Sequence, residues 1–550
     1  MHAPTAIAES ILSNADVVTM DDERPSAEAI AIAGGRILAV GSEAQMLALR
    51  KDATRIVNLG GRAVMPGFID GHSHFFQVAL VSGSANVSAP PVGTVSTIAE
   101  IVTTLEEYAA QYPPQPGAWL LGFGYDGSAL RDGREATRDD LDAAFPDTPV
   151  LLVHVSGHGC LLNSAALKIV GIDANTPTPQ GGVIARKPGT TEPTGLLMET
   201  AWLRVLGFVP RPTPQQALAS IAVAQASYAA NGYTTAQDAP AIAPIMKLYE
   251  TAAEQGLLSI DLVAYADADG LAERVASGLQ FPTTYKNRLK VGGLKLILDG
   301  SPQGKTAFFT KPYLTDGPNG EKNYRGAPVI TADELQRAVR FAYDHGAQVL
   351  AHCNGDGAIE MMLEAHRAAG APSGRRTTII HSQFVRRDQL ERYVDYGMVA
   401  SFFTNHAYFW GDVHVKNLGK ERAYFLSPMK TAGALGIRMS DHSDFFVTPL
   451  NPLFIAWTAV NRVSRSGEII GPDERVSAYA AFKALTIDAA YQYGEEKRKG
   501  SIAPGKLADL VVLDRNPLKV ESSQIKDVCV MKTFKEGRLV YEHGSDARRV

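Results

Sequence analysis

The sequence predicts an α/β protein: a TIM-type (β/α)8 barrel with a large insertion after its first strand, joined to a small β-sandwich domain built from both chain ends. Eight short apolar runs alternate with helical stretches in the middle of the chain. A long segment separates the first two runs, and strand-like runs with glycine turns occur near both ends. Alternating strands and helices are typical of a parallel sheet.

The chain ends carry the pattern of short antiparallel strands. Residues 16–20, 29–32 and 36–40 are rich in apolar and β-branched side chains and are separated by Gly34-Gly35 and followed by Gly41. Similar runs return at 508–514, 528–533 and 537–541. Such runs bounded by turn residues favour strands. We therefore expect residues 1–64 and 491–550 to form one β-sandwich domain.

The middle of the chain, residues 65–490, has the strand count of a barrel. Helical stretches such as 334–344 and 388–396 separate the apolar runs, as in βα units. The eight expected strands are residues 64–70, 233–237, 260–265, 293–298, 348–352, 378–381, 399–403 and 437–440. Residues 75–231, between the first two, are predicted to be an insertion with its own strand (150–155) and helix (214–231), which caps the barrel mouth.

Composition favours a globular protein that acts on small molecules. Of 550 residues, 45% are hydrophobic and 20% charged, and the formal net charge is −5 without a long basic run, which argues against nucleic acid or an anionic membrane as partner. Three cysteines lie far apart, so we expect reduced thiols. No N-terminal leader pattern and no run of about 18 apolar residues is present, which predicts a cytoplasmic location.

Two histidines at the end of the first apolar run form the first candidate metal site. His72 and His74 flank Ser73. In a strand, side chains at i and i+2 lie on one side, about 7 Å apart along the chain, so two imidazoles there can share an ion. Taken alone, the spacing also fits a surface pair or a hydrogen-bonded pair.

Four further polar residues lie on or at the ends of later expected strands: Lys295, His352, His381 and Asp441. Singly, each histidine also fits a buried core position and Asp441 a helix or turn cap. In (β/α)8 barrels, however, catalytic groups lie at the C-terminal ends of the strands. The placement of all four residues on or at the ends of strands therefore favours a single catalytic site that contains them.

Lys295 needs its own explanation because an ammonium group in an apolar strand is costly unless it is paired or neutral. A neutral lysine can react with CO2, and the resulting carbamate has two oxygens that can bridge two cations. The alternative is an ion pair with Asp299 or Asp441.

Several motifs give the chain a resemblance to a known family over nearly its whole length. They are 65–74 (MPGFIDGHSH), 156–159 (SGHG), 163–167 (NSAAL), 195–199 (GLLME), 294–295 (LK), 299–301 (DGS), 352–359 (HCNGDGAI), 440–441 (SD) and 499–511 (KGSIAPGKLADLV). The chain resembles the metal-dependent amidohydrolase superfamily, and specifically its YtcJ-like branch, which includes N-substituted formamide deformylases. It departs from that branch at Cys353, Ile380 and residues 442–445, which leaves substrate preference open.

The resemblance implies a two-metal hydrolytic centre and a metal-dependent amidohydrolase activity on a C–N bond, such as that of an N-substituted formamide or an aryl amide. His72, His74 and Asp441 would hold one ion, His352 and His381 the other, and carboxylated Lys295 would bridge them. Zinc is the expected metal, although manganese, iron or cobalt suit the same ligands. Asp441 is the expected general base and acid. Hydrolysis of a carbamate, a cyclic amide or an ester, and a non-catalytic binding protein on this fold, remain alternatives.

Substrate contacts are predicted from the cap and from aromatic residues near the strand ends. His158, in a glycine-rich turn of the insertion, is expected to orient the substrate carbonyl, and otherwise is a structural loop histidine. Phe76, Phe403, Trp410 and Phe446 are expected to line an apolar pocket for the amide substrate, and otherwise belong to the core. Oligomeric state is left open, a homodimer included.

Overall fold

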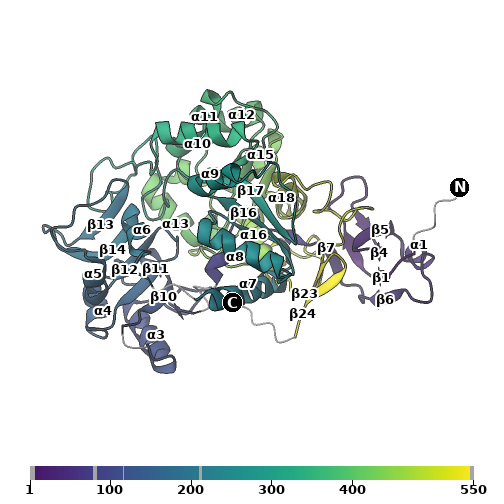
Figure 1. The fold of residues 1–550 in the computed structure, drawn as a ribbon, viewed down its shortest axis with the longest axis horizontal. Coiled ribbons are helices and arrows are strands. Elements are labelled where there is room, and N and C mark those ends of the chain that lie inside the picture. Colours follow the sequence, from purple (N-terminus) through teal and green to yellow (C-terminus); the bar gives the residue numbers. More distant parts are fainter. Residues whose placement is uncertain (1–6, 79–82, 115–116, 210–212, 545–550) are drawn as a thin grey trace.

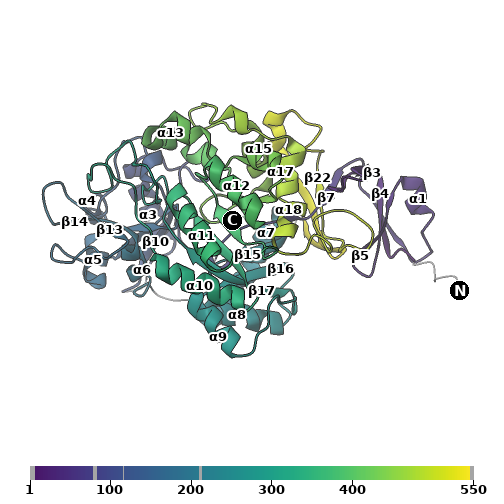
Figure 2. The same cartoon turned by 90° about the horizontal axis from the view of Figure 1, so that it is seen from above.

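The computed structural model describes residues 7–78, 83–114, 117–209 and 213–544. Both views show three parts in a row: the inserted segment at one end, the central sheet with its helices in the middle, and the strands from the chain ends at the other end (Figure 1, Figure 2). The outermost parts of the predicted ranges, residues 1–6 and 545–550, lie outside the described residues, as do 79–82, 115–116 and 210–212 of the predicted insertion.

The central sheet has eight strands that follow one another in chain order. Every adjacent pair is parallel. The strands are β8 (Phe68–Ile69), β15 (Tyr233–Asp238), β16 (Asp261–Ala266), β17 (Leu289–Ile297), β18 (Gln348–Cys353), β19 (Thr378–His381), β20 (Val399–Phe402) and β21 (Met439–Asp441). The eight parallel strands expected from the sequence are therefore present, within a few residues of the predicted bounds.

The first expected strand, residues 64–70, is divided between two sheets. β7 (Ala63–Pro66) pairs with strands from the chain ends, and β8 begins the central sheet after Gly67. A Cβ atom on Gly67 would lie 2.3 Å from Cγ2 of Thr234, so the close approach to β15 favours glycine at this break.

The two edge strands of the central sheet, β8 and β21, are brought together by the loops that follow them. The backbone N–H of Asp444 donates to the carbonyl of His72 (3.1 Å), and that of His74 donates to the carbonyl of Phe445 (2.8 Å). Ser443 Oγ donates to the buried carboxylate of Asp70 (2.6 Å). The sheet is therefore curled, and the residues that follow its two ends lie side by side.

Helices follow the strands of the central sheet. In α10 (Ala332–Asp344), Thr331 and Glu334 form a capping box, and Leu335, Val339 and Ala342 form the buried face, as expected for an amphipathic helix. The other long helices of this part are α7 (Pro214–Ala230), α8 (Ala243–Glu254), α9 (Ala268–Ala276), α11 (Asp356–Ala368), α12 (Arg387–Tyr396), α13 (His406–Leu418) and α16 (Pro452–Asn461). Shorter ones are η1 (Phe75–Gln77), α14 (Lys420–Tyr424), α15 (Met429–Ala434), η3 (Pro472–Glu474), α17 (Ala478–Ala484) and α18 (Ile487–Gln492).

The inserted segment contains a six-stranded sheet of its own in the order β13-β14-β12-β11-β10-β9. Its strands are β9 (Ala85–Asn86), β10 (Leu120–Tyr125), β11 (Val150–His154), β12 (Gly159–Leu162), β13 (Gly182–Arg186) and β14 (Pro193–Glu199), and its helices are α3 (Ile98–Gln111), η2 (Gly127–Ala129), α4 (Arg138–Asp142), α5 (Ser164–Val170) and α6 (Thr200–Val205). The helix predicted at 214–231 is present as α7, but it contacts β15, β23 and β24 rather than this sheet (Figure 1).

Strands from both chain ends share one six-stranded sheet, in the order β24-β23-β22-β7-β2-β3. Its members are β2 (Asp16–Val18), β3 (Ser26–Ala27), β7, β22 (Leu510–Leu513), β23 (Val530–Lys535) and β24 (Arg538–Glu542). A four-stranded sheet beside it contains β1 (Ser10–Ser13), β4 (Ala29–Ala33), β5 (Arg36–Gly41) and β6 (Arg55–Asn58), and α1 (Glu43–Leu47) packs against one face of it. η4 (Ser522–Asp527) precedes β23. The two sheets share a core that includes Leu12, Ile30, Val64 and Val512.

Among the described residues, no helix has the length and apolar character needed to cross a membrane.

Candidate metal centre

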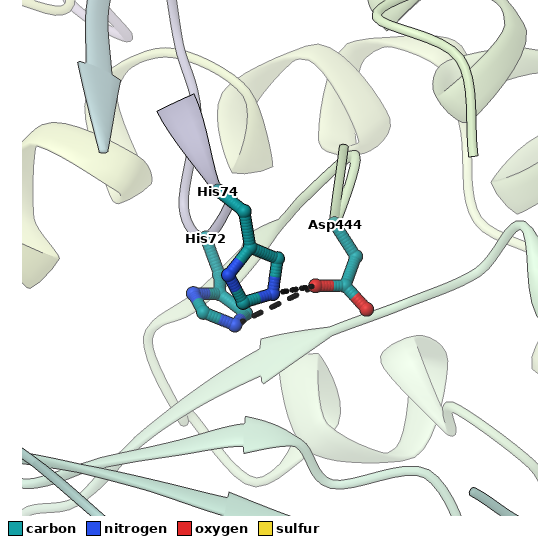
Figure 3. A group of neighbouring side chains, drawn as sticks. All are labelled: His72, His74 and Asp444. Carbon is teal, nitrogen blue, oxygen red and sulfur yellow. Dashed lines mark ion pairs between the residues drawn. The ribbon is translucent and has the colours of Figure 1, made fainter. Parts of the chain in front are cut away.

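Side chains from three strand ends meet at the C-terminal edge of the central sheet. Nε2 of His72 lies 3.0 Å from Nζ of Lys295 and 3.5 Å from Oδ1 of Asp444. Nε2 of His74 lies 3.3 Å from the same oxygen. Figure 3 shows both imidazole rings directed at the Asp444 carboxylate. The ligand atoms of His72, His74 and Asp444 all lie within 4.8 Å of one another, so these three residues can hold one metal ion.

A second pair of ligand atoms lies next to the first group. Nδ1 of His352 is 3.1 Å from Nε2 of His381, and the rings of His72 and His381 are 5.6 Å apart. His352 ends β18 together with Cys353, and Cys353 pairs with His381 of the neighbouring β19. The two histidines can therefore face one ion next to the group of His72.

The acidic member of the group differs from the one expected. Asp441 ends β21, and its carboxylate accepts hydrogen bonds from Thr404 Oγ1 (2.6 Å), Thr404 N (3.2 Å) and His442 N (3.0 Å). The carboxylate that reaches His72 and His74 belongs to Asp444, in the turn that follows. The sequence carries a signal for this choice, since Ser440-Asp441 is repeated as Ser443-Asp444.

The turn geometry explains why Asp444 reaches the histidines. Its backbone has a positive φ of 48°, a left-handed conformation that is uncommon outside glycine. The hydrogen bond from its N–H to the carbonyl of His72 fixes the turn against the segment after β8. Such backbone strain is often found at functional sites.

Surrounding side chains fix the orientation of the histidines. Oε1 of Gln237 accepts from Ser73 N (3.2 Å) and lies 2.8 Å from Nδ1 of His72, so Nδ1 carries the proton and Nε2 remains free to bind a metal. Nδ1 of His381 lies 3.1 Å from Nε2 of His442. Nε2 of His352 lies 3.5 Å from Oδ1 of Asp299. These three rings thus each have a polar partner on the nitrogen that points away from the proposed ion.

Neither ion pair considered for Lys295 occurs among the described residues. Asp299 instead accepts hydrogen bonds from the backbone N–H groups of Phe308, Asn354 and Gly355. Asp441 is engaged by Thr404, as described above. The Lys295 side chain is buried, 3% exposed, and its nearest polar partner is His72.

Burial sets the protonation of this group. It lowers the pKa of His72, His352 and His381 well below their usual value, which favours the neutral, metal-binding imidazole. Burial also lowers the pKa of Lys295 to about 7 and raises that of Asp441 to about 7. For Asp444 burial has the same upward effect, but the hydrogen bond and charge of His74 outweigh it and lower the pKa. Asp444 is therefore the carboxylate that stays ionised.

His158 reaches the centre from the inserted segment. It lies in the turn between β11 and β12, and its ring is 5.0 Å from that of His352. Its Nδ1 is 2.9 Å from Oε2 of Glu199, whose Oε1 accepts from Thr306 Oγ1 (2.6 Å). Burial lowers the pKa of His158, but the charge and hydrogen bond of Glu199 outweigh it and the net shift is upward.

The chain matches known proteins along most of its length. Residues 55–541 match the model described as the amidohydrolase family. The chain belongs to the amidohydrolase family. The resemblance inferred from the sequence motifs is therefore confirmed, including its branch, as the relatives below indicate.

Three relatives span nearly the whole amidohydrolase. An N-substituted formamide deformylase from Arthrobacter pascens is 30% identical over 98% of this chain and 99% of its own. Protein LONG AFTER FAR-RED 3 from Arabidopsis thaliana is 32% identical, covering 97% and 92%, and the putative amidohydrolase YtcJ from Bacillus subtilis (strain 168) is 29% identical, covering 96% and 98%. A crystal structure of an uncharacterized metal-dependent hydrolase from Pyrococcus furiosus is similar with a TM-score of 0.72 and 25% identity, over 93% of this chain and all of that one.

The four predicted aromatic contacts of the amidohydrolase lie at different distances from the centre. Phe446 lies beside it, between the rings of His74 (6.1 Å) and Phe123 of β10 (5.1 Å). Phe403 is buried behind the histidines, stacked on His442 at 5.0 Å. Phe76 is half-buried, and its backbone N–H donates to Asp238 (3.4 Å). Trp410 is buried, and its Nε1 donates to Asp126 of the inserted segment (2.9 Å).

A cavity opens beside the candidate centre, between the inserted segment and the central sheet. Most of the residues that line it are polar, and none of the four predicted aromatic residues is among them. The lining residues are Ser156, His158, Ser301, Pro302, Gln303, His352, Asn354, His381, His406, Asp444 and Val447. A polar ligand bound here would contact the candidate metal-binding residues on one side and His158 on the other.

Proposed function

We propose that this protein is a metal-dependent hydrolase that cleaves a non-peptide C–N bond of a small amide, with N-substituted formamides as the first class to test. The observation that carries the proposal is the gathering of His72, His74, Lys295, His352, His381 and Asp444 at one edge of a parallel sheet. The full-length similarity to an N-substituted formamide deformylase supports the choice of amide.

The donor set fits two divalent ions. His72, His74 and Asp444 form one group, and His352 with His381 forms the other. Three observations support the fit: Gln237 leaves Nε2 of His72 free, a ring nitrogen of His352 faces one of His381, and Lys295 is buried next to His72. We propose that Lys295 is carboxylated and bridges the two groups. Zinc suits imidazole and carboxylate oxygen ligands.

The ions would supply Lewis acidity and a water of lowered pKa, and the protein residues would do the rest. Asp444 takes the role that the sequence suggested for Asp441: it accepts the proton of the attacking water and delivers it to the leaving nitrogen. Asp441 instead holds the loop of Thr404 beside the site through its hydrogen bonds.

We propose that His158 donates a hydrogen bond to the substrate carbonyl oxygen as negative charge develops there. Its Nδ1–H donates to the Glu199 carboxylate. Burial opposes protonation of His158, but Glu199 outweighs it and raises the pKa, which favours the doubly protonated ring with an Nε2–H available to the cavity that His158 lines. Glu199 is a positioning residue in this proposal, because its carboxylate favours the imidazolium form and fixes the plane of the His158 ring.

The same proposal assigns roles to the larger parts of the chain. The curled eight-stranded sheet would form a closed (β/α)8 barrel within residues 65–490, the inserted segment within 75–231 would cap its mouth, and residues 1–64 and 491–550 would form the β-sandwich domain. Contacts from Phe123 and His158 of the insertion to Phe446 and His352 support the cap.

A turnover screen tests the function. Purified protein is loaded with zinc, its metal content is measured, and it is offered N-formyl, N-acyl, carbamate, cyclic amide and ester substrates of matched size. We expect about two ions per chain and the highest kcat/KM on an N-formyl or N-acyl amine. Faster turnover of carbamates or esters would show that the enzyme acts on that class of bond rather than on amides. If the metal-loaded protein turns over none of these substrates, the proposal is contradicted and a binding protein is favoured.

A further inference from the structure

Three residues that line the cavity each have a buried side-chain oxygen with no hydrogen-bond partner in the described part of the chain. These oxygens are Oγ of Ser301, Oε1 of Gln303 and Oδ1 of Asn354. The three residues are 3%, 8% and 4% exposed. Buried polar atoms are almost always paired, and leaving one unpaired costs roughly 1–3 kcal/mol. Three in one wall therefore indicate a ligand that supplies donors.

The orientation of the Asn354 amide is fixed by its neighbours. Its Nδ2 donates to the carbonyl of Gly300 (3.0 Å), and its backbone N–H donates to Asp299 (2.9 Å). Reversing the amide would place its oxygen against the Gly300 carbonyl, so Oδ1 is the atom left without a partner. Asn354 therefore offers an acceptor, not a donor.

Ser301 and Gln303 belong to a turn that is held on both sides. Ser301 N–H donates to Thr306 Oγ1 (2.9 Å), and Thr306 N–H donates back to the Ser301 carbonyl (2.9 Å). Thr306 Oγ1 also donates to Glu199, the partner of His158. The backbone of the turn is thus positioned together with His158, and it places Ser301 and Gln303 in the lining of the cavity.

The proposed ligand class follows from the chemistry of this wall. We propose that the cavity is a binding subsite for the part of the substrate attached to the amide, and that it selects polar amides with N–H or O–H donors within a few atoms of the scissile bond. This inference rests on the proposed function. It disfavours the hydrophobic aryl amide suggested by the sequence, because a group without donors would bury the three oxygens unpaired.

Two pairs of probes test the subsite. N-formylethanolamine is compared with N-formyl-2-methoxyethylamine, and N-formylglycinamide with N-formylglycine N,N-dimethylamide. All four share the formamide N–H, and the first member of each pair has a further O–H or N–H donor that the second lacks. We expect kcat/KM to favour the donor member of at least one pair by about tenfold or more, as for sites built to bind a substrate hydroxyl or N–H. Ratios near one for both pairs would overturn the inference.

Substitutions of the cavity residues test whether a preference for the donor-bearing substrates comes from these oxygens. Gln303→Met and Ser301→Ala remove an acceptor with little change in size, and each should bring the ratio toward one. Gln280→Met, at an exposed glutamine, should leave it unchanged. A preference that survives both cavity substitutions would also overturn the inference, because ordered water rather than substrate would then satisfy these oxygens.

A binding experiment that does not depend on turnover separates this inference from the proposed function. If no formamide is turned over, the function fails, and the inference is judged on the zinc-loaded protein with N-formylethanolamine and N-formyl-2-methoxyethylamine as binding probes, followed by ligand-observed NMR. Tighter binding of N-formylethanolamine that is lost in Gln303→Met supports the subsite. Equal binding, or no binding of either formamide, contradicts it.

Discussion

Nδ1 of His158 lies 2.9 Å from Oε2 of Glu199, and both residues come from the inserted segment. Glu199 is the last residue of β14, and the neighbouring strand β12 begins directly after His158, so the sheet of the insertion brings the two side chains together. Glu199 has a positive φ of 53° and is 7% exposed. A strained, buried carboxylate bound to a histidine that faces a cavity is the arrangement expected of a functional pair.

Replacing Glu199 by Gln tests the pair. Glutamine keeps the size but removes the charge that favours the protonated His158 ring, so we expect kcat to fall about tenfold with little change in KM, less than the roughly hundredfold loss expected for His158→Ala. NMR should show a strongly downfield His158 Nδ1 proton that is absent from Glu199→Gln. Glu192→Gln, at a partly exposed carboxylate of the same segment, is the control. A change in KM alone would assign Glu199 to substrate binding.

Two aspartates near the end of β21 can be separated by substitution. Asp444→Asn should lower bound metal and reduce kcat by several orders of magnitude, because an amide is a weaker ligand and cannot accept the proton. Asp441→Asn should retain metal, since its carboxylate contacts Thr404 and the His442 backbone. Metal analysis after zinc loading and kcat on the best formamide report both effects. If Asp441→Asn instead lost metal and activity while Asp444→Asn retained both, Asp441 would be the metal ligand.

Lys295 can be tested by chemical rescue. Lys295→Ala should lose the bridging group and with it most metal and activity, and short carboxylic acids such as formate or propionate should restore part of both by occupying the vacated space. Lys286→Ala, at an exposed lysine that precedes β17, should behave as wild type. Zinc-loaded Lys295→Ala that keeps two ions and full turnover without added acid would remove Lys295 from the centre.

Much of this architecture is readable from the sequence because it depends on local patterns. Short apolar runs predict strands β15 to β20 within a few residues, and His72, His74, His352 and His381 follow as polar groups at strand ends. The division of the first strand at Gly67 was not predicted, because it depends on the close approach of Thr234.

The remaining site residues depend on contacts that no local pattern encodes. Asp444 lies in a turn rather than a strand, and reaches His72 only through a left-handed backbone and a hydrogen bond between distant segments. Glu199 meets His158 across paired strands. Aromatic residues are the hardest to assign: Phe403 stacks on His442 and Trp410 bonds to Asp126, although their spacing in the sequence equally suits a pocket wall.

A buried ion cluster joins the central sheet to the strands of the chain ends and gives a stability prediction. The carboxylate of Asp261, at the start of β16, lies 2.5 Å from Nζ of Lys499 and 2.8 Å from Nζ of Lys535, which ends β23. Lys499 and Lys535 are each 1% exposed. Burial alone would raise the pKa of Asp261, but the two lysines outweigh it and hold the pKa well below its usual range.

Asp261→Asn should therefore destabilise the protein by roughly 3 kcal/mol at neutral pH, because it leaves two buried ammonium groups undercompensated. Since the folded-state pKa is lowered, this contribution is complete above the unfolded value of about 3.9 and is lost as the pH falls through the folded value. The difference in unfolding free energy between wild type and variant should then shrink below about pH 4. Asp316→Asn, which breaks an exposed pair with Lys322, should cost less than about 1 kcal/mol. Equal effects of the two substitutions in denaturant titrations would show that the cluster contributes no more than a surface ion pair.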